Sequence, residues 1–496
     1  MSKQYLLDSV LLRDGWARQA LVTVTPEGLI SHIDATFASA TRSDAAQSCE
    51  DAPRAPEEDA AKVIERISGY IVPGMANGHS HAFQRGMAGN TEYRLSARDS
   101  FWTWRQAMYA LANRITPADL EVLSTQLFVE MLKSGYTSVA EFHYLHRAAD
   151  GTHYAGSNEL WDAITRAAET TGIGLTFLPA LYQTSDFGSQ PLKPEQARFA
   201  METERFLRAI DERVREERAR RASTQRTGAA FHSLRAVPLE SLREAVRGLR
   251  AIHSGLPLHI HIAEQVKEVD ACLQSTGRRP IELLLDTGLV DEHWCLVHAT
   301  HATPAELESI AASGAAVCVS ISTEANLGDG FFDAARFLSA GGRVCVGSDS
   351  QATVCPAEEL RWMEYQGRLR KKRRAVLADE AEAHVGTRLW RDAARHGAAA
   401  IGQSAGSIAV GARADWVVLD GAHPSMAGAT PETALDHVLF SGGCGAIRDV
   451  MVAGRWVVRD RRHAAESALA EPFRESMDRL RWSGRSPARG PSWACA

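Results

Sequence analysis

Two histidines, His79 and His81, stand two residues apart directly after the apolar run at residues 70–72. In an extended chain, residues at this spacing project to the same side, so both imidazoles can reach one metal ion. The alternative is a polar loop that happens to contain two histidines, because short motifs often arise without a site. The metal interpretation therefore needs further ligands from elsewhere in the chain.

Three other segments place chemically active side chains at the ends of apolar runs. His261 and Glu264 close one such run, His298 closes the next, and Asp349 follows a glycine turn after another. These residue types bind metals and transfer protons. A strand-end histidine taken alone is more often an ordinary surface or capping residue. The recurrence of such signals in chain order favours one shared site.

The elements that must position these residues lie in a segment from about residue 71 to 402, where strand-like runs alternate with stretches of helical spacing. Strands separated by helices indicate a parallel sheet, and their number favours a closed (β/α)8 barrel over an open sheet. Functional residues of such barrels lie at the C-terminal ends of the strands. The strand-like runs are residues 136–142, 175–181, 258–262, 294–298, 315–321 and 343–346.

The two ends of the chain have a different pattern. Residues 1–70 and 403–460 alternate short apolar runs with turns, which is typical of β-hairpins. We expect them to combine into one β-domain beside the barrel. Residues 36–62 are rich in Ala, Ser, Asp, Glu and Pro and predict a loose surface insertion. Residues 461–496 predict an amphipathic helix followed by a tail.

Composition narrows the class of partner. The chain has 496 residues, 45% of them hydrophobic, and a formal net charge of -6 with a pI near 6.3. Nucleic-acid-binding proteins usually need a basic excess, so a small-molecule partner is expected, with neither nucleic acid nor membrane. The N-terminus lacks an apolar core of signal-peptide length, and no segment has the apolar length that crosses a bilayer.

The cysteines indicate a cellular compartment. The eight of them are scattered without a CxxC pair, and several lie inside apolar runs. This distribution is typical of buried free thiols in a reducing environment. We therefore expect a cytoplasmic protein without disulfides.

The order of HxH, histidine, histidine and aspartate along the chain resembles the amidohydrolase superfamily, and the resemblance covers nearly the whole sequence apart from the insertion and the tail. It implies a metal-dependent TIM-type barrel with a small β-sandwich domain built from both ends of the chain. Glu264, three residues after His261, matches the one-metal deaminase branch. A two-metal branch would carry a carboxylated lysine on the fourth strand, and residues 175–181, the candidate for that strand, contain no lysine.

The resemblance implies one divalent ion, with Zn²⁺ expected and Fe²⁺ as the alternative, held by His79, His81, His261 and Asp349. This ligand set leaves the ion partly positive, so that its water loses a proton with a pKa of roughly 7 in zinc enzymes. Asp349 would also be the first proton acceptor. His298 would orient or help to deprotonate the water, and Glu264 would carry the proton to a substrate nitrogen.

Closer similarity is to one family of this superfamily, the formiminoglutamate deiminases of histidine degradation. It implies hydrolysis of N-formimino-L-glutamate to N-formyl-L-glutamate and ammonia. The blocks that carry it are NGHSHAFQRGMAG (77–89), DSFWTWRQAMY (99–109), SVAEFHYLH (138–146), HSLRAV (232–237) and STEANLGDG (322–330). The residues that match the substrate contacts of the family are Gln84, Arg105, Tyr144, His232 and Arg235. Cationic and hydroxyl donors of this kind suit the two carboxylates of a glutamate derivative.

Two other functions remain open from the sequence. An aminohydrolase of a nucleobase or another aromatic amine would use the same metal site, but it predicts an apolar stacking pocket in place of two arginines. A catalytically silent scaffold would lack a ligand, and none is missing. Gln351 stands where the family pattern has histidine, and Cys355 is also unusual, so we expect an altered pocket rim. The resemblance further implies a homodimer.

Overall fold

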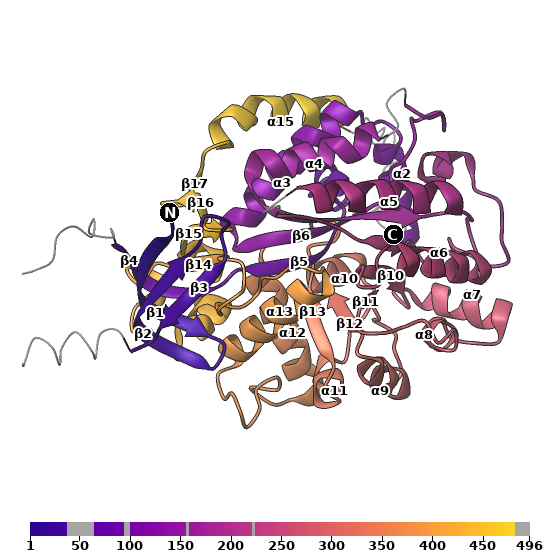
Figure 1. Cartoon of the computed structure of the whole chain (residues 1–496). Helices are drawn as coiled ribbons and strands as arrows, with labels where there is room; N and C mark the ends of the chain where they lie inside the picture. The colour runs from indigo at the N-terminus through magenta and orange to yellow at the C-terminus, as the bar shows by residue number, and fades with distance from the viewer. Residues whose placement is uncertain (37–63, 94–99, 155–157, 221–223, 482–496) are drawn as a thin grey trace, which may run out of the picture.

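The computed structural model describes residues 1–36, 64–93, 100–154, 158–220 and 224–481 (Figure 1). The predicted insertion, apart from residue 36, and the tail from residue 482 lie outside these ranges. Within the described ranges, none of the helices combines the length and the apolar character needed to span a membrane.

Eight parallel strands form a nearly closed barrel at the centre of the fold, and they neighbour one another in sequence order. Their interior and exterior are both covered, which explains why the sequence shows continuous apolar runs rather than alternation. An additional short strand, β8 (Gln225–Thr227), pairs with the third strand of the barrel. The barrel strands are β5 (Met75–Ser80), β6 (Tyr136–His143), β7 (Gly174–Leu181), β9 (Ala229–Phe231), β10 (Leu258–Ile262), β11 (Trp294–His298), β12 (Ala316–Val319) and β13 (Arg343–Val346).

The first and last strands meet at their C-terminal ends. The backbone N–H groups of Ser348 and Asp349 both donate to the carbonyl of His79, at 3.1 and 3.0 Å. The N–H of His81 donates in return to the carbonyl of Asp349 at 3.1 Å. These hydrogen bonds join residues about 270 positions apart in the chain. Barrel closure therefore brings the HxH motif next to Asp349.

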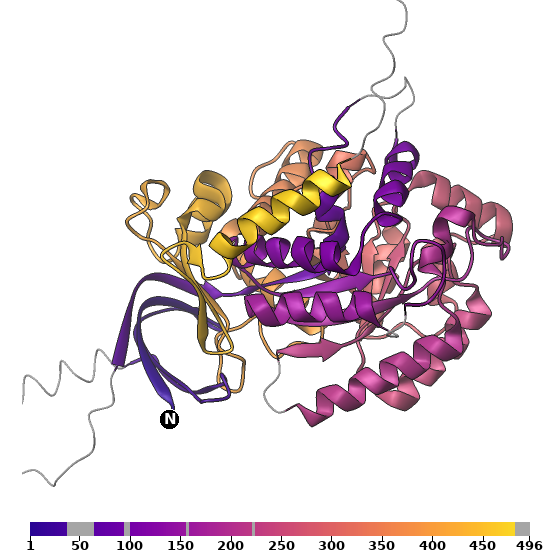
Figure 2. The same ribbon diagram turned by 90° about the horizontal axis from the view of Figure 1, so that it is seen from above.

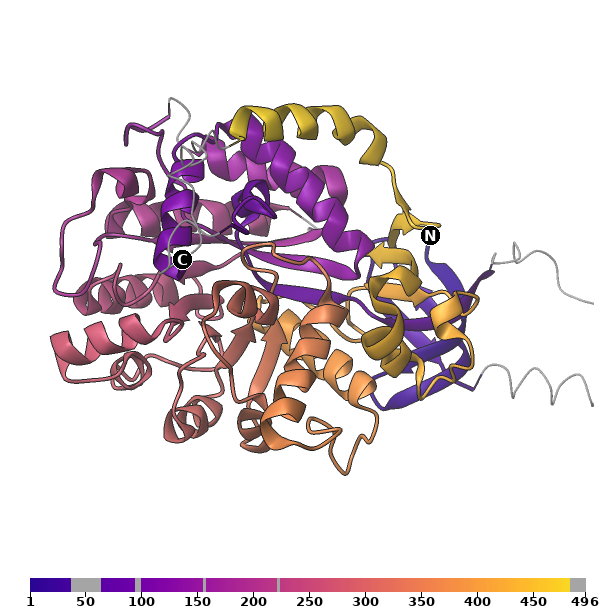
Figure 3. The same ribbon diagram turned by 180° about the vertical axis from the view of Figure 1, so that it is seen from behind.

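Helices surround the barrel, as Figures 1 and 3 show. The residues Leu242, Ala245, Val246 and Leu249 of α6 recur at helical spacing and are all buried, which is the pattern of a helix with one face on a core. The covering helices are α3 (Pro117–Lys133), α4 (Glu159–Thr171), α5 (Thr203–Ala219), α6 (Leu239–Ile252), α7 (Val266–Thr276), α8 (Pro280–Leu285), α9 (Pro304–Ser313), α10 (Ile321–Leu327), α11 (Ala334–Ser339), α12 (Pro356–Lys371) and α13 (Val385–Ala400).

Short segments at the C-terminal ends of the strands build the surroundings of the site. They are η1 (Ala82–Met87), α2 (Phe101–Ala112) and η2 (Pro194–Phe199). Asn113, at the end of α2, donates through its side-chain amide to the carbonyl of Glu195 at 3.0 Å. The buried Arg198 donates to the backbone carbonyls of Ala112 and Arg147. These contacts fix η2 against α2.

Strands from both chain ends form a second, mixed sheet beside the barrel, which Figure 2 shows from above. The strand β4 joins the two halves, because it pairs parallel to β1 and antiparallel to β14. Tyr5 and Trp416 pack edge to face at 5.4 Å in the core of this sheet. The strands are β1 (Lys3–Leu12), β2 (Gly15–Val24), β3 (Ile30–Asp34), β4 (Ile64–Pro73), β14 (Trp416–Leu419), β15 (Ile447–Val452), β16 (Arg455–Arg459) and β17 (Arg462–His463).

The remaining elements belong to the C-terminal part of the chain. The predicted amphipathic helix is present as α15, and it lies along α3 in all three views (Figures 1–3). Arg479 of α15 pairs with Asp119 of α3 at 2.7 Å. The elements are η3 (Pro424–Met426), α14 (Ala434–His437), η4 (Val438–Gly442), η5 (Gly443–Ala446) and α15 (Glu466–Leu480).

The assignment of residues 175–181 as the fourth barrel strand is wrong. They fall within β7, the third strand, and the fourth strand is β9. Since β9 has only three residues, Ala229–Phe231, it is too short for its apolar run to stand out in the sequence. Neither strand contains a lysine, so neither can supply a bridging carboxylated lysine.

The expectation that the cysteines are all free is also wrong. Cys355, immediately before α12, forms a disulfide with Cys444 in η5. The two lie 89 residues apart without a recognisable motif, so only the tertiary structure brings them together. The other four cysteines of the described residues are free and buried, namely Cys272, Cys295, Cys318 and Cys345. Cys49 and Cys495 lie outside the described ranges.

Candidate metal centre and active-site pocket

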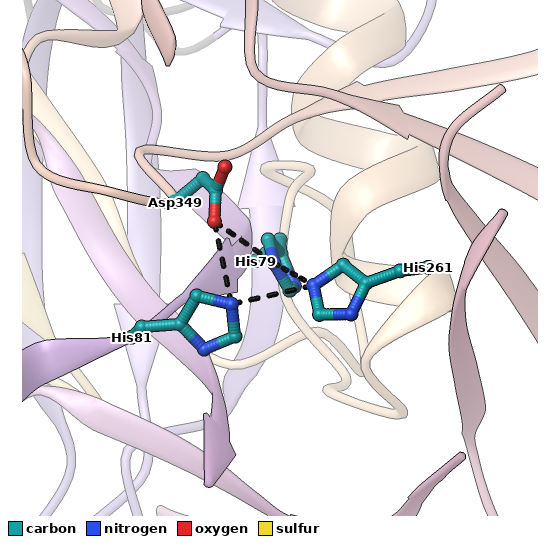
Figure 4. Close-up of side chains that lie close together, drawn as sticks. All are labelled: His79, His81, His261 and Asp349. Carbon is teal, nitrogen blue, oxygen red and sulfur yellow. Dashed lines mark hydrogen bonds and ion pairs between the residues drawn. The ribbon is translucent and has the colours of Figure 1, made fainter. Parts of the chain in front are cut away.

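Four side chains converge at the C-terminal end of the barrel (Figure 4). His79 lies on β5, His81 directly follows it, His261 lies on β10 and Asp349 follows β13. Each is buried, and their ligand atoms all lie within 4.8 Å of one another. The set matches the four ligands that the sequence predicts.

The atoms that face one another are three imidazole nitrogens and one carboxylate oxygen. The Nε2 atom of His261 lies 3.0 Å from Nε2 of His79 and 3.3 Å from Nε2 of His81. The Oδ1 atom of Asp349 lies 3.2 Å from Nε2 of His79 and 3.4 Å from Nε2 of His81. All four donor atoms are thus directed to one small volume.

The outer ring nitrogens reveal the protonation of two of these histidines. The Nδ1 atom of His81 lies 2.8 Å from the carbonyl of Phe142, and Nδ1 of His261 lies 2.8 Å from the carbonyl of His232. Because a carbonyl only accepts, both Nδ1 atoms carry hydrogen, and in neutral rings both Nε2 atoms present lone pairs. Lone pairs that face each other beside a carboxylate repel unless a cation lies between them.

Burial keeps these histidines neutral. It lowers the pKa of His79 to about 3 and holds the pKa of His81 and His261 below the usual value. Burial opposes ionisation of Asp349, but the adjacent histidines hold its pKa well below its usual range. Three neutral imidazoles and one carboxylate are suitable ligands for a divalent metal ion. The donor set therefore fits a buried His/His/His/Asp metal site.

Two further groups that the sequence predicts lie beside this cluster. The Nε2 atom of His298 is 3.8 Å from Oε1 of Glu264 and 3.9 Å from Oδ2 of Asp349. Burial is the main cause that raises the pKa of Glu264 to about 7; His298 opposes the shift and Asp349 adds to it. Burial lowers the pKa of His298, but Glu264, Glu324 and Asp349 together raise it to about 10.

The strand ends around the site adopt unusual backbone conformations. Ala263, His298 and Asp349 have φ values of +51°, +72° and +42°. Residues other than glycine adopt this left-handed region at a cost, and such strain is concentrated at functional sites. The same turns place His298 and Asp349 over the barrel axis, where they face the histidine cluster. The strain thus coincides with the residues that carry the proposed chemistry.

A pocket opens above the metal site. His81, His261 and Asp349 line its floor together with Glu264 and His298, and His79 lies beneath. All five residues that match the family's substrate contacts also line this pocket, namely Gln84, Arg105, Tyr144, His232 and Arg235. Barrel closure therefore brings every site residue predicted from the sequence to one place.

The two arginines of this pocket have free donor groups. The Nε atoms of Arg105 and Arg235 are buried, and neither has a hydrogen-bond partner among the described residues. The Arg105 guanidinium also lies 4.3 Å from the centre of the Trp102 ring, which is the geometry of a cation–π contact. Two such donor groups in one pocket suit a ligand that carries two carboxylates.

The pocket also contains residues that the sequence reasoning missed. They are Phe101, Trp104, Met108, Tyr109, Tyr182, Phe199 and Leu327. Tyr182 directly follows β7, so its position at a strand end was a usable signal. Tyr109 stands at the end of the DSFWTWRQAMY block. Neither tyrosine is among the residues that match the family's substrate contacts, so the sequence prediction omitted both.

Gln351 lies beneath the pocket rather than at its rim, which corrects the expectation for this residue. Its side chain is 2% exposed and is absent from the pocket lining. Its amide donates to the carbonyl of Asp349 at 2.7 Å and to the hydroxyl of Ser80 at 3.1 Å. The substitution for histidine therefore acts on the backbone that supports the metal site. Cys355 likewise lies in the disulfide and outside the pocket lining.

Comparison with known proteins identifies a family and relatives that match this chain over most of its length. Residues 70–457 match the model of the Amidohydrolase family. The chain is 46% identical over 473 residues to formimidoylglutamate deiminase from Pseudomonas aeruginosa, a match that covers 95% of this chain and 98% of the relative. It is 28% identical to a 5-methylthioadenosine/S-adenosylhomocysteine deaminase from Natronomonas pharaonis, over 79% of this chain and 82% of that protein.

Solved structures share the fold. The crystal structure of an amidohydrolase from Brucella melitensis superimposes with a TM-score of 0.85 at 37% identity and covers 96% of this chain and 99% of that one. The structure of an adenosine deaminase from Xanthomonas campestris with bound zinc gives a TM-score of 0.74 at 20% identity over 96% of this chain and 98% of that one. The second likeness concerns the fold alone. With its family match, its barrel and its buried metal site, this chain belongs to the amidohydrolase family.

Proposed function

We propose that this chain is a metal-dependent formimidoylglutamate deiminase, which hydrolyses N-formimino-L-glutamate to N-formyl-L-glutamate and ammonia. The observation that carries the proposal is the pair of arginines, Arg105 and Arg235, beside a metal site in one pocket. A glutamate derivative brings two carboxylates to such a pocket, whereas a nucleobase brings none. The 46% identity to a formimidoylglutamate deiminase supports the same substrate.

The residues of the floor would share the proton transfers. His79, His81, His261 and Asp349 would hold the divalent ion, which supplies the Lewis acidity that makes water reactive near neutral pH. Asp349 would receive the proton that the water loses, and His298, whose pKa of about 10 keeps it protonated near neutral pH, would orient the water.

Glu264 would complete the reaction. Its carboxyl group, with a pKa of about 7, is suited to passing a proton to the imino nitrogen of the substrate. The formimino carbon gains a bond to oxygen and loses its bond to the imino nitrogen, which leaves as ammonia, while its bond to the glutamate nitrogen is kept. Glu264 lies beside His298, so both proton-handling groups reach the same space.

The decisive experiment is a coupled ammonia assay with purified, metal-loaded protein. N-formimino-L-glutamate is compared with guanine, adenosine and cytosine, and release of ammonia from the first alone is expected. Turnover of a base without turnover of N-formimino-L-glutamate rejects the proposal and favours the nucleobase alternative.

Arg235→Ala tests the pocket within the same assay. We expect kcat/KM for N-formimino-L-glutamate to fall by about 100-fold, because a buried charge-assisted contact is lost. Metal content should stay unchanged. Arg250→Ala is the matched control, because Arg250 pairs with Asp291 outside the pocket. Equal kcat/KM values for Arg235→Ala and the control would remove Arg235 from the site.

Three further properties belong to the proposal. We propose Zn²⁺ as the resident ion, with Fe²⁺ as the alternative. Because both ions accept imidazole and carboxylate ligands, metal analysis of protein purified from cells decides between them. A homodimer is proposed on the family resemblance, with light scattering as the test. A cytoplasmic location is supported by the four buried free thiols, whereas the Cys355–Cys444 disulfide is uncommon there.

A further inference from the structure

Three side chains at the wall of the pocket form a connected group that the proposed chemistry does not yet use. Tyr109 of α2 and Tyr182 after β7 both line the pocket, and Gln196 of η2 lies behind them. The amide nitrogen of Gln196 lies 3.2 Å from the hydroxyl of Tyr109 and 2.7 Å from that of Tyr182. Gln196 is 2% exposed, so its amide makes these contacts away from water.

The orientation of this amide follows from a third contact. The backbone N–H of Lys193 donates to Oε1 of Gln196 at 3.0 Å. Because a backbone N–H only donates, the oxygen of the amide must face Lys193 and the NH2 group must face the tyrosines. The two hydrogens of that NH2 group are then given to the oxygens of Tyr109 and Tyr182.

Both tyrosine oxygens therefore act as acceptors toward Gln196, and their own hydrogens point elsewhere. Two hydroxyls can exchange one hydrogen bond between themselves, and the pKa of Tyr182, raised first by burial and also by Tyr109, agrees with such a contact. Even then, one hydroxyl hydrogen remains for an acceptor in the pocket. Tyr109 and Tyr182 thus present donor character to a ligand.

The two arginines beside Tyr109 and Tyr182 are also hydrogen-bond donors. Arg105 and Arg235 line the same pocket, and both arginines act electrostatically on Tyr182. A wall that combines guanidinium and hydroxyl donors suits a group that only accepts, which is a carboxylate. A carboxamide would turn its NH2 group toward these donors and leave hydrogen bonds unmade.

The position of the pair indicates which carboxylate it would bind. The ring of His232 lies between Tyr182 and the metal-site residue His261, at 4.6 Å from the first and 5.1 Å from the second. Tyr109 and Tyr182 both pack on Phe199, at 5.6 and 5.5 Å. Tyr182 therefore lies one aromatic ring away from the metal site, and Tyr109 shares the contact with Phe199, so the pair lies where the more distant end of a substrate would reach.

We propose that Tyr109 and Tyr182, oriented by Gln196, bind the side-chain carboxylate of the substrate and select an acidic side chain over an amide or an apolar one. The proposal rests on the proposed deiminase function and deepens it. The tyrosines act as specificity-determining residues in contact with substrate, and Gln196 is a positioning residue that acts through them.

The test compares substrates that differ only at the side-chain end. Tyr109→Phe and Tyr182→Phe are assayed with N-formimino-L-glutamate and with N-formimino-L-norvaline, whose side chain ends in a methyl group. We expect kcat/KM for the first to fall about 10- to 100-fold, mainly through KM, because a hydrogen bond to a charged group is lost. The value for the second should stay within about twofold. Equal losses for both substrates, or no loss, would overturn the proposal.

Gln196→Glu tests the orientation without removing a hydroxyl. The new carboxylate accepts the tyrosine hydrogens instead of donating to their oxygens, so the donors no longer face the pocket. The same selective loss for N-formimino-L-glutamate is expected, and a smaller loss for Gln196→Met. If Gln196→Glu keeps the wild-type preference between the two substrates, the proposed role of Gln196 is wrong.

Tyr136→Phe is the matched control, because the hydroxyl of Tyr136 is buried at the start of β6 and outside the pocket. It should leave both kcat/KM values unchanged. Calorimetry of metal-loaded protein with N-formyl-L-glutamate and N-formyl-L-norvaline gives a second readout, which does not depend on turnover. Failure of wild-type protein to release ammonia would reject the deiminase function. Loss of the binding preference in the tyrosine variants would support the proposed subsite, and an unchanged preference would overturn it.

Discussion

The carboxylate of Glu324 lies against the outer nitrogen of His298, with Oε1 3.3 Å from Nδ1, and both side chains are fully buried. The backbone N–H of Ser320 donates to the same oxygen at 3.1 Å. This contact places hydrogen on Nδ1 of His298 and turns Nε2 toward Glu264 and Asp349. Glu324 is thus placed to position His298 without touching the substrate itself.

Loss of this carboxylate should impair the reaction without loss of metal. We expect Glu324→Gln to lower kcat about 100-fold with little change in KM, because His298 loses the buried carboxylate that orients its ring and helps to raise its pKa. The pH profile of kcat should also change shape, which a packing defect would not cause. Glu359→Gln replaces a buried carboxylate outside the pocket and serves as the control. Wild-type kcat in Glu324→Gln would contradict this role.

Metal binding should depend on the depth in the barrel at which a histidine of β10 lies, because His259 and His261 project to the same side of the strand but one layer apart. His261 belongs to the metal cluster, whereas His259, two residues earlier, contacts the carbonyl of Ala400 at 3.0 Å. We expect His261→Ala to lose nearly all bound metal and His259→Gln to keep it, as measured by elemental analysis. Chelation should lower the Tm of wild-type protein, and added Zn²⁺ should restore it. Full metal content in His261→Ala would refute the ligand assignment.

The buried carboxyl of Glu359 should make stability fall as pH rises. Burial raises its pKa to about 8 from the ordinary value of 4.5, although the Ser322 N–H opposes this shift. The folded state therefore holds this proton more tightly than the unfolded state, so the stability contribution is present below pH 4.5 and is lost as pH rises through about 8.

Glu359→Gln removes this titration. Denaturant unfolding at several pH values between 5 and 8.5 should show the variant gaining stability relative to wild type as pH increases. A difference between the two proteins that does not vary with pH would show that Glu359 has no raised pKa.

The Cys355–Cys444 disulfide should stabilise the fold without affecting catalysis directly. It closes a segment of 89 residues and ties the start of α12 to η5. Cys444→Ser should lower the free energy of unfolding by about 2–4 kcal/mol, chiefly because the unfolded chain regains conformational freedom. Reductant should destabilise wild-type protein and leave Cys444→Ser unchanged in thermal unfolding. Equal Tm values for wild type under both conditions would show that the bond is absent in solution.

The sequence by itself determined the chemistry of the metal site. His79, His81, His261 and Asp349 could be singled out as candidates because each stands at the end of an apolar run, which is a local property, and the family resemblance implied that they are the metal ligands. The alternation of strands and helices likewise predicted the barrel, which the structure confirms. The short strand β9 was missed because three residues give no usable periodicity.

Only the tertiary structure decided the contacts between residues distant in the chain. The Cys355–Cys444 bond, the support of His298 by Glu324 and the orientation of Tyr109 and Tyr182 by Gln196 all join different elements. No local pattern encodes such pairs, because their distances are set by how the strands close and the helices pack. The sequence therefore determined which residues carry the chemistry, and packing decided which neighbours orient them.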